Sequence, residues 1–261
     1  MKFPEKVKTH IVNWLKNYLI HSKQNGFVVG VSGGVDSALT STLCALSNFP
    51  VYAIQMPIHQ NIKEVSRSTN HMKWLETNFK NVKSFSHSLS DVFDVFKEGI
   101  ELKQELNQLS LANTRARLRM TTLYYFAGTY KCLVAGTGNK IEDFGVGFYT
   151  KYGDGGVDIS PIADLFKSEV FSLASHLKIS KSILNAKPTD GLWDDGRTDE
   201  DQMGANYDDL ETTMKLIEKK VPNSNLSNKD KATKTIFEKL HNQNKHKMLP
   251  IPVCEIPKEY L

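Results

Sequence analysis

The sequence predicts an α/β protein with a doubly wound, mostly parallel sheet and helices on both of its faces. Short apolar runs typical of buried strands alternate with longer segments of helical periodicity. Two of these apolar runs end in glycine turns that lead into helices, as strands of such sheets often do. With 261 residues, 40% of them hydrophobic, the chain can bury one large core, so a single domain spanning residues 1–261 is expected.

The N-terminal segment predicts a helix followed by the first strand. Apolar residues at helical spacing give this helix an amphipathic pattern; they are Val7, Ile11, Trp14, Leu15, Tyr18 and Leu19. The helix ends before Asn25 and Gly26, and the apolar run from Phe27 to Val31 follows as a buried strand.

A turn of sequence Ser-Gly-Gly-Val-Asp-Ser, residues 32–37, joins this strand to the next helix. The glycine pair lets the backbone point several N–H groups at one place, and the helix start adds its positive dipole end, so the turn suits a phosphate. The turn is not a Walker A loop, because the Gly-Lys-Ser/Thr of such loops does not follow it. Without that lysine, the phosphate charge must be offset by a metal or by cations from elsewhere, and Asp36 is well placed to hold a metal. An ordinary strand-turn-helix corner is the alternative.

Further strands and helices alternate after this turn. Residues 51–56 predict a second strand that Pro57 ends, residues 64–79 a helix, and residues 82–85 a third strand. Residues 91–131 have a helical pattern that we expect to be broken near Leu109 to Asn113.

Arg115, Arg117 and Arg119 precede the apolar part of this last helix. On a helix Arg115 and Arg119 share a face and Arg117 points elsewhere, so one binding patch cannot use all three. Solvated charge explains the cluster as well as binding does. Its place before an apolar helix favours the anchoring of at least one arginine near a site.

Residues 132–140 predict another apolar strand that ends in a glycine turn, and Glu142 follows at a helix start. In a parallel sheet this turn and the Ser-Gly-Gly turn open on the same edge. Glu142 is then able to face Asp36 across a phosphate, and two carboxylates with phosphate oxygens are a common Mg²⁺ site. The alternative is that Glu142 only caps a helix.

Residues 148–158, rich in glycine and aspartate, predict a structural turn or a substrate loop before a helix that starts near Lys167.

Composition restricts the partners that the chain can have. The net charge of +4 is mild and the basic residues are spread out, so we expect no nucleic-acid partner. Cys44 and Cys132 have apolar neighbours and Cys254 lies far from both, which favours buried reduced thiols over disulfides or a metal site. No apolar run reaches the length of a membrane span and no signal-peptide core is visible, so we expect no membrane partner and a cytoplasmic location.

Six segments of the chain resemble, in family order, the ammonia-dependent NAD synthetases of the ATP-pyrophosphatase superfamily. They are GVSGGVDS (30–37), NTRARLRM (113–120), VAGTGNKIED (134–143), FYTKYGDGGVDISPIADLFK (148–167), KPTDGLWDDGRTDEDQMGANYDDLE (187–211) and NKHKMLPIPV (244–253). One departure is that the commoner Gly-Thr-Asp-His segment of the family reads Gly-Thr-Gly-Asn at residues 136–139. The resemblance implies a Rossmann-like fold of the adenine nucleotide α-hydrolase type. Because a glutaminase domain has no room in the chain, it also implies that ammonia is the nitrogen donor.

The resemblance also implies site residues. ATP contacts are assigned to Gly30, Val31, Ser32, Gly33, Gly34, Val35, Asp36, Ser37, Thr137, Lys167 and Thr189. Contacts to deamido-NAD⁺ are assigned to Arg117, Lys151, Asp158, His246 and Lys247. Mg²⁺ is assigned to Asp36 and Glu142, and a catalytic role to Lys167. Asp154 is a further, weaker candidate, since a carboxylate near the reacting carbonyl could position or deprotonate ammonium.

The implied reaction has two steps. The nicotinic acid carboxylate of deamido-NAD⁺ attacks the α-phosphate of ATP and expels pyrophosphate, and ammonia then displaces AMP from the acyl-adenylate to give NAD⁺. Lys167, Mg²⁺ and the loop amides would stabilise the charge on the departing pyrophosphate. Two alternatives are a tRNA-modifying adenylating enzyme, which typically carries an RNA-binding domain or zinc cysteines, and a nucleotide-binding protein without activity, which would not need Asp36, Glu142 and Lys167.

The segment from Asp190 to Glu211 is strongly acidic and predicts a solvated or mobile loop. The resemblance suggests that this segment folds over the ATP site when substrates bind. Because this segment and the turn from Tyr152 to Asp158 are rich in charge or glycine and adjoin residues assigned to substrates, we expect both to be mobile in the free enzyme and to close over the substrates, which excludes water from the acyl-adenylate. The resemblance also implies a homodimer with the deamido-NAD⁺ site at the subunit interface. Near the C-terminus a lysine-rich helix over residues 231–240 and an extended tail are expected.

Overall fold

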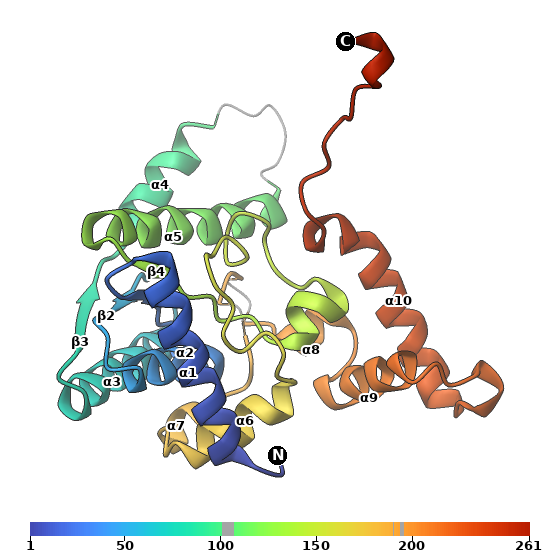
Figure 1. Cartoon of the computed structure of the whole chain (residues 1–261), viewed down its shortest axis with the longest axis horizontal. Helices are drawn as coiled ribbons and strands as arrows, with labels where there is room; N and C mark the ends of the chain where they lie inside the picture. Colours follow the sequence, from blue (N-terminus) through green and yellow to red (C-terminus); the bar gives the residue numbers. More distant parts are fainter. Residues whose placement is uncertain (101–106, 190, 194–195) are drawn as a thin grey trace.

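The structure is a computed structural model that describes residues 1–100, 107–189, 191–193 and 196–261 (Figure 1). Its strands are β1 (Phe27–Gly30), β2 (Val51–Gln55), β3 (Val82–Ser86) and β4 (Leu133–Val134). Its α-helices are α1 (Pro4–Ser22), α2 (Val35–Leu46), α3 (Ile62–Asn78), α4 (Ser90–Glu98), α5 (Gln108–Tyr130), α6 (Lys167–His176), α7 (Lys181–Leu184), α8 (Asp199–Met203), α9 (Tyr207–Glu218) and α10 (Asn228–Met248). A π-helical turn, η1 (Ile141–Val146), and two 3₁₀ turns, η2 (Asn223–Asn225) and η3 (Lys258–Tyr260), complete the elements.

Within the described residues, four parallel strands form one sheet in the order β3-β2-β1-β4. Phe27 of β1 lies opposite Val51 of β2 on one side and opposite Leu133 of β4 on the other. A single parallel bridge between Ala135 and Ile159 extends the sheet past β4. The parallel sheet and its covering helices confirm the predicted fold class.

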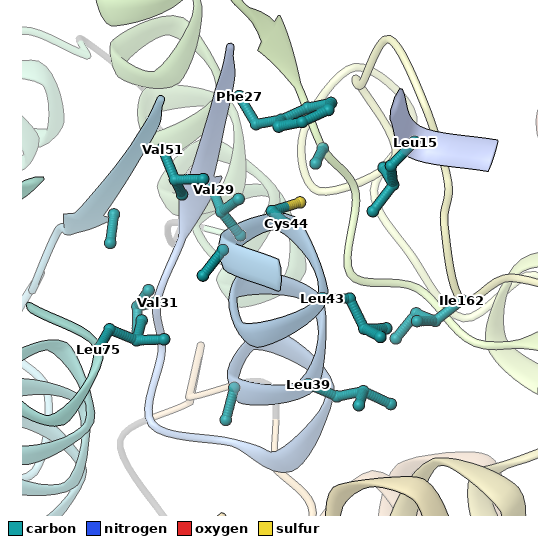
Figure 2. Packing of buried hydrophobic residues seen from close by; sticks show 14 of the residues in the cluster. Leu15, Phe27, Val29, Val31, Leu39, Leu43, Cys44, Val51, Leu75 and Ile162 are labelled. Atoms are coloured by element: carbon teal, nitrogen blue, oxygen red, sulfur yellow. The ribbon is translucent and has the colours of Figure 1, made fainter. Parts of the chain in front are cut away.

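The sheet is buried on both faces. Alternate residues of β1 enter different cores, because successive side chains of a strand point to opposite faces. Phe27 and Val29 pack with α1, α2, α3 and α6, whereas Val28 packs with α4 and α5. Figure 2 shows the first of these cores around Leu39, Leu43 and Cys44 of α2. This burial fixes the start of α2, where the glycine turn lies, against the carboxyl end of β1.

A third apolar cluster lies away from the sheet and joins η1 to α9 and α10. Its buried members include Ile141 and Val146 of η1, Tyr207 and Leu210 of α9, and Phe237 of α10. Figure 1 shows α9 and α10 on the side of the molecule opposite β3. The cluster matters for function because it packs α9 against the turn that carries Glu142.

The break between the helices of the 91–131 segment is not where the pattern predicted it. Leu109 to Asn113 lie inside α5, and the described helices instead stop at Glu98 and resume at Gln108. Asn107 caps α5, since its side chain accepts a hydrogen bond from the backbone N–H of Ser110 at 2.9 Å. This capping signal lies only two residues before the predicted break and was missed.

The expectation of a solvated loop is also wrong for much of the acidic segment. Asp199–Met203 form α8, and α9 starts at Tyr207. Asp199, Met203, Tyr207, Leu210 and Glu211 are buried, with at most 5% of each residue exposed. Acidic side chains here cap helices, as Asp201 does when it accepts hydrogen bonds from the backbone N–H and hydroxyl of Thr198. Asp190, Asp194 and Asp195 lie outside the described residues, and the closure of this segment over substrates stays a prediction.

The C-terminal helix is longer than predicted and the tail after it is exposed. α10 begins at Asn228 because Ser227 and Asp230 form a capping box, and it ends at Met248 before Pro250. Every residue from 249 to 261 is exposed, including Ile251, Val253 and Ile256. Figure 1 shows this tail leading away from the body of the protein.

The cysteine thiols are in the reduced state that the sequence favours. All three cysteines are free; Cys44 and Cys132 are buried and Cys254 is exposed on the tail. Burial raises the pKa of the Cys132 thiol to about 11. In the described part of the chain, no helix combines the length and the apolar character that crossing a bilayer requires.

His71 makes the stability of the fold depend on pH. Its ring lies in α3, 4% exposed, with Nε2 3.0 Å from the hydroxyl of Ser41 in α2, and burial lowers its pKa to about 4. In the unfolded chain the imidazole takes up a proton near pH 6.5, whereas the folded protein resists this until about pH 4. Stability is therefore unaffected by His71 above pH 6.5 and falls as the pH drops from there toward 4, by roughly 2–3 kcal/mol.

The variant His71→Gln tests this expectation, because glutamine keeps a hydrogen-bonding group but does not titrate. Urea unfolding at pH 7.5 and pH 4.5 gives the loss of stability for each protein. We expect the variant to lose roughly 2–3 kcal/mol less than the natural protein over this interval. An equal loss in both proteins would show that other groups cause the acid sensitivity.

Candidate active site

The Ser-Gly-Gly turn forms a braced loop at the carboxyl end of β1. The hydroxyl of Ser37 accepts a hydrogen bond from the backbone N–H of Ser32 at 3.2 Å and donates one to the carbonyl of Gly34 at 3.0 Å. The hydroxyl of Ser32 in turn accepts from the N–H of Gly34. These bonds hold the loop open at the N-terminus of α2, where backbone N–H groups and the helix dipole favour an anion.

Gly33 is required at its position for two reasons. Its φ is +92°, which side-chain-bearing residues rarely adopt, and a Cβ there would lie 2.7 Å from the carbonyl oxygen of Glu64. Arg67 of α3 closes the same contact, since its Nε donates to the carbonyl of Gly33 at 3.2 Å. The loop is therefore packed directly on α3.

A buried lysine lies between two carboxylates beside this loop. Nζ of Lys167, at the start of α6, is 2.7 Å from Oδ2 of Asp36 and 3.1 Å from Oε1 of Glu142. Only 3% of Lys167 is exposed. Burial alone would lower the pKa of this lysine, but Asp36 and Glu142 outweigh it and raise the pKa above its usual value. The structure thus brings together the three charged residues on which the sequence argument depended.

Tyr207 completes this cluster, and the sequence argument did not identify it. Its hydroxyl donates to Oε1 of Glu142 at 2.6 Å and lies 3.3 Å from Oδ2 of Asp199. Nζ of Lys167 lies over the ring of Tyr207, 4.7 Å from its centroid. Burial, Glu142 and Asp199 raise the pKa of the phenol well above its usual value, so it remains a donor at neutral pH. The acidic residues around Tyr207 predicted a solvated segment, so Tyr207 was not considered as a site residue.

The departure from the commoner family sequence at residues 138 and 139 has a local explanation. Asn139 is fully buried; its Nδ2 donates to Oδ1 of Asp36 at 3.2 Å, and its Oδ1 accepts from the N–H groups of Ile141 and Glu142. A Cβ at Gly138 would lie 2.1 Å from Oδ1 of Asp143. Burial, followed by repulsion from Glu142, Asp154 and Asp36, raises the pKa of Asp143 to about 8. The absence of a side chain at Gly138 thus leaves space for the carboxyl group of Asp143, the residue after Glu142 in η1.

A cavity of about 260 Å³ opens beside the loop and collects most of the predicted ATP contacts. Every assigned ATP residue except Gly33 lines it, together with Glu142 and Asp154. Arg119, Gln60 and Arg67 also line the cavity and had no assigned role. Arg119 is anchored there because its Nε donates to the carbonyl of Met56 at 3.0 Å, which confirms that at least one arginine of the cluster is anchored beside the cavity.

The residues assigned to deamido-NAD⁺ do not line this cavity. Four of them gather where α5, the 148–158 loop and α10 meet: Arg117 donates to the carbonyl of Lys151 at 3.3 Å, and Nζ of Lys151 donates to the carbonyl of His246 at 3.1 Å. Nζ of Lys247 donates to the carbonyls of Gly147 and Tyr149, and burial lowers the pKa of this lysine. Lys247 therefore ties α10 to the loop in this structure.

Asp158 lies apart from this basic group. Its Oδ1 accepts from the hydroxyl of Tyr124 at 2.9 Å, and its Oδ2 accepts from the backbone N–H of Val134 at 2.8 Å. These bonds fasten the end of the glycine-rich turn to β4. In this structure Asp158 links the glycine-rich turn to β4 and to Tyr124 of α5.

The fold and the site together define a class of protein. A doubly wound sheet carries a glycine turn that leads into a helix N-terminus, with a buried lysine and two carboxylates beside it, an arrangement that suits a nucleotide-dependent enzyme. Residues 7–250 match the NAD synthase family, and the chain belongs to that family, whose members are ligases.

Relatives with known names agree with this assignment. The chain is 42% identical to the NH(3)-dependent NAD(+) synthetase of Archaeoglobus fulgidus, over 82% of this chain and 85% of that one. Among solved structures it is similar to the NMN synthetase of Francisella tularensis, with a TM-score of 0.82, 29% identity and 98% of both chains covered. It is also similar to the NH3-dependent NAD synthetase of Campylobacter jejuni, with a TM-score of 0.75, 25% identity, and 97% and 99% of the two chains covered.

Proposed function

We propose that this enzyme uses ATP to join ammonia to the nicotinic acid carboxyl group of deamido-NAD⁺, forming NAD⁺, AMP and pyrophosphate. The observation that carries the proposal is the position of Lys167, which is buried beside the phosphate loop and between two carboxylates. The membership of the family and the names of its relatives support the same reaction. A carboxylate is inert to ammonia, so a leaving group must first be made, and ATP supplies it.

In the first step, the adenylation of the acid substrate, different residues of the cavity have different roles. The loop amides at the start of α2 bind phosphate oxygens. The ammonium of Lys167 offsets charge that builds on the departing pyrophosphate, and a preorganised cation in a water-poor site is effective there. Thr137 and Thr189 lie on the lining where they can contact ATP.

Asp36 and Glu142 would hold a Mg²⁺ ion. The pair already accommodates one cation, since the ammonium of Lys167 lies within 3.1 Å of an oxygen of each carboxylate. Two carboxylates, with phosphate and water oxygens, are a donor set that Mg²⁺ accepts. No group of three or more metal-ligating side chains occurs among the described residues. When bound, the ion neutralises phosphate charge and orients the phosphoryl group.

Asp154 is proposed to act on the nitrogen donor. It lines the cavity, and its Oδ1 is fixed by the backbone N–H of Thr150 at 2.9 Å. A carboxylate near the reacting carbonyl attracts ammonium and can accept its proton, which frees the nucleophilic ammonia. Asp154 would act through its position, because it lines the cavity from the glycine-rich turn.

A second candidate for the acid substrate is a molecule smaller than deamido-NAD⁺. The similarity to an NMN synthetase covers nearly the whole chain, and the residues assigned to deamido-NAD⁺ lie outside the cavity. Nicotinic acid mononucleotide carries the same reacting carboxylate without the adenylate half. Purified protein with ATP, Mg²⁺ and ammonium, given each acid in turn, tests the proposal: kcat/KM should be higher for deamido-NAD⁺. A clear preference for the mononucleotide would support the second candidate, and no amide from either would overturn the proposed reaction.

We expect free ammonia, and not glutamine, to supply the nitrogen. Release of ammonia from glutamine commonly uses a cysteine nucleophile activated by a neighbouring base. Cys44 and Cys132 are buried with raised thiol pKa values, Cys254 is on the tail, and none of the three lines the cavity. NAD⁺ formation by the purified chain should follow ammonium concentration. Equal rates with glutamine in ammonia-free buffer would contradict this expectation.

We further propose that the protein is a homodimer whose second copy completes the binding of the acid substrate. Tyr125 of α5 is 71% exposed, and Val92 and Val95 of α4 are also exposed. The tail after Met248 presents further apolar side chains to solvent. Burial of such surface favours association. Sedimentation at assay concentrations tests the proposal, and a fully active monomer would contradict it.

A further inference from the structure

Tyr207 contacts both kinds of charge in the site through different parts of its side chain. The hydroxyl donates to Oε1 of Glu142 at 2.6 Å, and the ring face lies under the ammonium of Lys167. Tyr207 itself is 5% exposed. A short hydrogen bond from a buried phenol to a carboxylate is among the stronger ones in proteins, because the acceptor is charged.

Lys167 contacts both carboxylates, and each carboxylate has one further neighbour of its own. Asp36 accepts from the buried amide of Asn139, which also caps η1. Glu142 shares its Oε1 between Lys167 and Tyr207. A metal at Oε1 would compete with both the ammonium of Lys167 and the phenol for that oxygen, whereas a metal at the other oxygen of Glu142 would leave the hydrogen bond of the phenol in place. The phenol, which is fixed by its ring, can then still hold the carboxylate in place.

Tyr207 is itself held in position without its hydroxyl. It is the first residue of α9 and packs in the apolar cluster with Ile141 and Phe237. Four residues on, Glu211 accepts from the backbone N–H and the hydroxyl of Ser168, at 2.8 and 2.7 Å. These contacts fix α9 on the start of α6. Removal of the hydroxyl alone should therefore leave the helix where it is.

We propose that Tyr207 is a positioning residue that keeps the Glu142 carboxylate aimed at the metal position, and that it links α9 to the reaction in this way. The inference rests on the proposed magnesium site at Asp36 and Glu142. The enzyme then binds the divalent cation more tightly, because Tyr207 orients the carboxylate of Glu142. The hydroxyl touches neither ATP nor ammonia in this account.

The test compares Tyr207→Phe with two other variants. Phenylalanine keeps the ring and removes only the donor. Glu211→Gln is the matched control, because it weakens the anchoring of α9 without touching Glu142, and Glu142→Gln removes the ligand itself. Mn²⁺ binding is measured by electron paramagnetic resonance in the presence of an ATP analogue with a methylene group between its α- and β-phosphorus atoms. Thermal unfolding of each variant reports on the fold.

We expect Tyr207→Phe to weaken Mn²⁺ binding roughly tenfold or more, the scale of one hydrogen bond to a charged group. Glu211→Gln should change it less than about twofold, with similar unfolding temperatures for both. Natural Mn²⁺ affinity in Tyr207→Phe, with binding lost in Glu142→Gln, would overturn the inference alone. Equal weakening in Tyr207→Phe and Glu211→Gln would also overturn it, since docking of α9 would then be the cause. Natural binding in Glu142→Gln would overturn the metal site and the inference with it.

Discussion

Replacement of Asp36 by asparagine, or of Glu142 by glutamine, is expected to lower the rate of amide formation by roughly 10²–10³-fold at ordinary Mg²⁺ concentrations. Each change keeps the shape of the side chain and removes one of the two carboxylates beside Lys167 that are proposed to hold Mg²⁺. The expected size is that of losing one group that stabilises charge in a transition state. Initial rates over a range of Mg²⁺ concentrations measure the effect, and excess metal should restore part of it.

Asp164→Asn is the matched control for these two variants. Its side chain is 98% exposed, it pairs with Lys140 at 3.4 Å, and it is not among the residues that line the cavity. We expect the control to have natural activity, since exposed ion pairs contribute little. Near-natural turnover in Asp36→Asn or Glu142→Gln would show that the carboxylate pair does not hold the metal.

Lys167→Met should produce the largest combined effect on activity and stability. Methionine fills the space but leaves the carboxylates of Asp36 and Glu142 close together and without their buried cation. Breaking a buried ion pair from one side typically costs about 3–5 kcal/mol. We expect unfolding at pH 7.5 without metal to show a loss of this size, and amide formation to fall below detection because the pyrophosphate charge loses its counterion.

Two comparisons make the lysine result specific. Lys140→Met removes a lysine whose partners, Asp164 and Glu218, are far more exposed, so a loss within about 1 kcal/mol is expected. Added Mg²⁺ should stabilise Lys167→Met more than the natural protein, because the vacated carboxylate pair gains a cation. A Lys167→Met protein of natural stability, with no response to Mg²⁺, would contradict the charge balance described for the site.

Local sequence signals were sufficient to predict the sheet and the Ser-Gly-Gly turn at the end of β1. The run from Phe27 to Val31 is apolar because both faces of β1 are buried, and Gly33 is needed for a backbone conformation that other residues avoid. Asp36 and Glu142 meet because parallel strands bring their carboxyl ends to one edge. These features depend on neighbours in sequence or on a general rule of topology.

The features that sequence reasoning missed depend on contacts between distant segments. Tyr207 is surrounded in sequence by acids, and only the packing of α9 on η1 places its hydroxyl on Glu142. Lys247 is a cation near the C-terminus, but its ammonium is used by the carbonyls of Gly147 and Tyr149. Charge patterns show that such residues are polar and do not show which partner they meet.

Activation of the acid substrate by adenylation transfers one of its carboxylate oxygens to AMP, and labelling with ¹⁸O detects this transfer. In that step a carboxylate oxygen bonds to the α-phosphorus of ATP, and pyrophosphate leaves. When ammonia displaces AMP, the C–O bond breaks and that oxygen remains on AMP. The purified enzyme is given deamido-NAD⁺ with both carboxyl oxygens replaced by ¹⁸O, together with ATP, ammonium and Mg²⁺. The account predicts one ¹⁸O in each AMP and none in pyrophosphate; ¹⁸O in pyrophosphate, or release of ADP and phosphate, would contradict it.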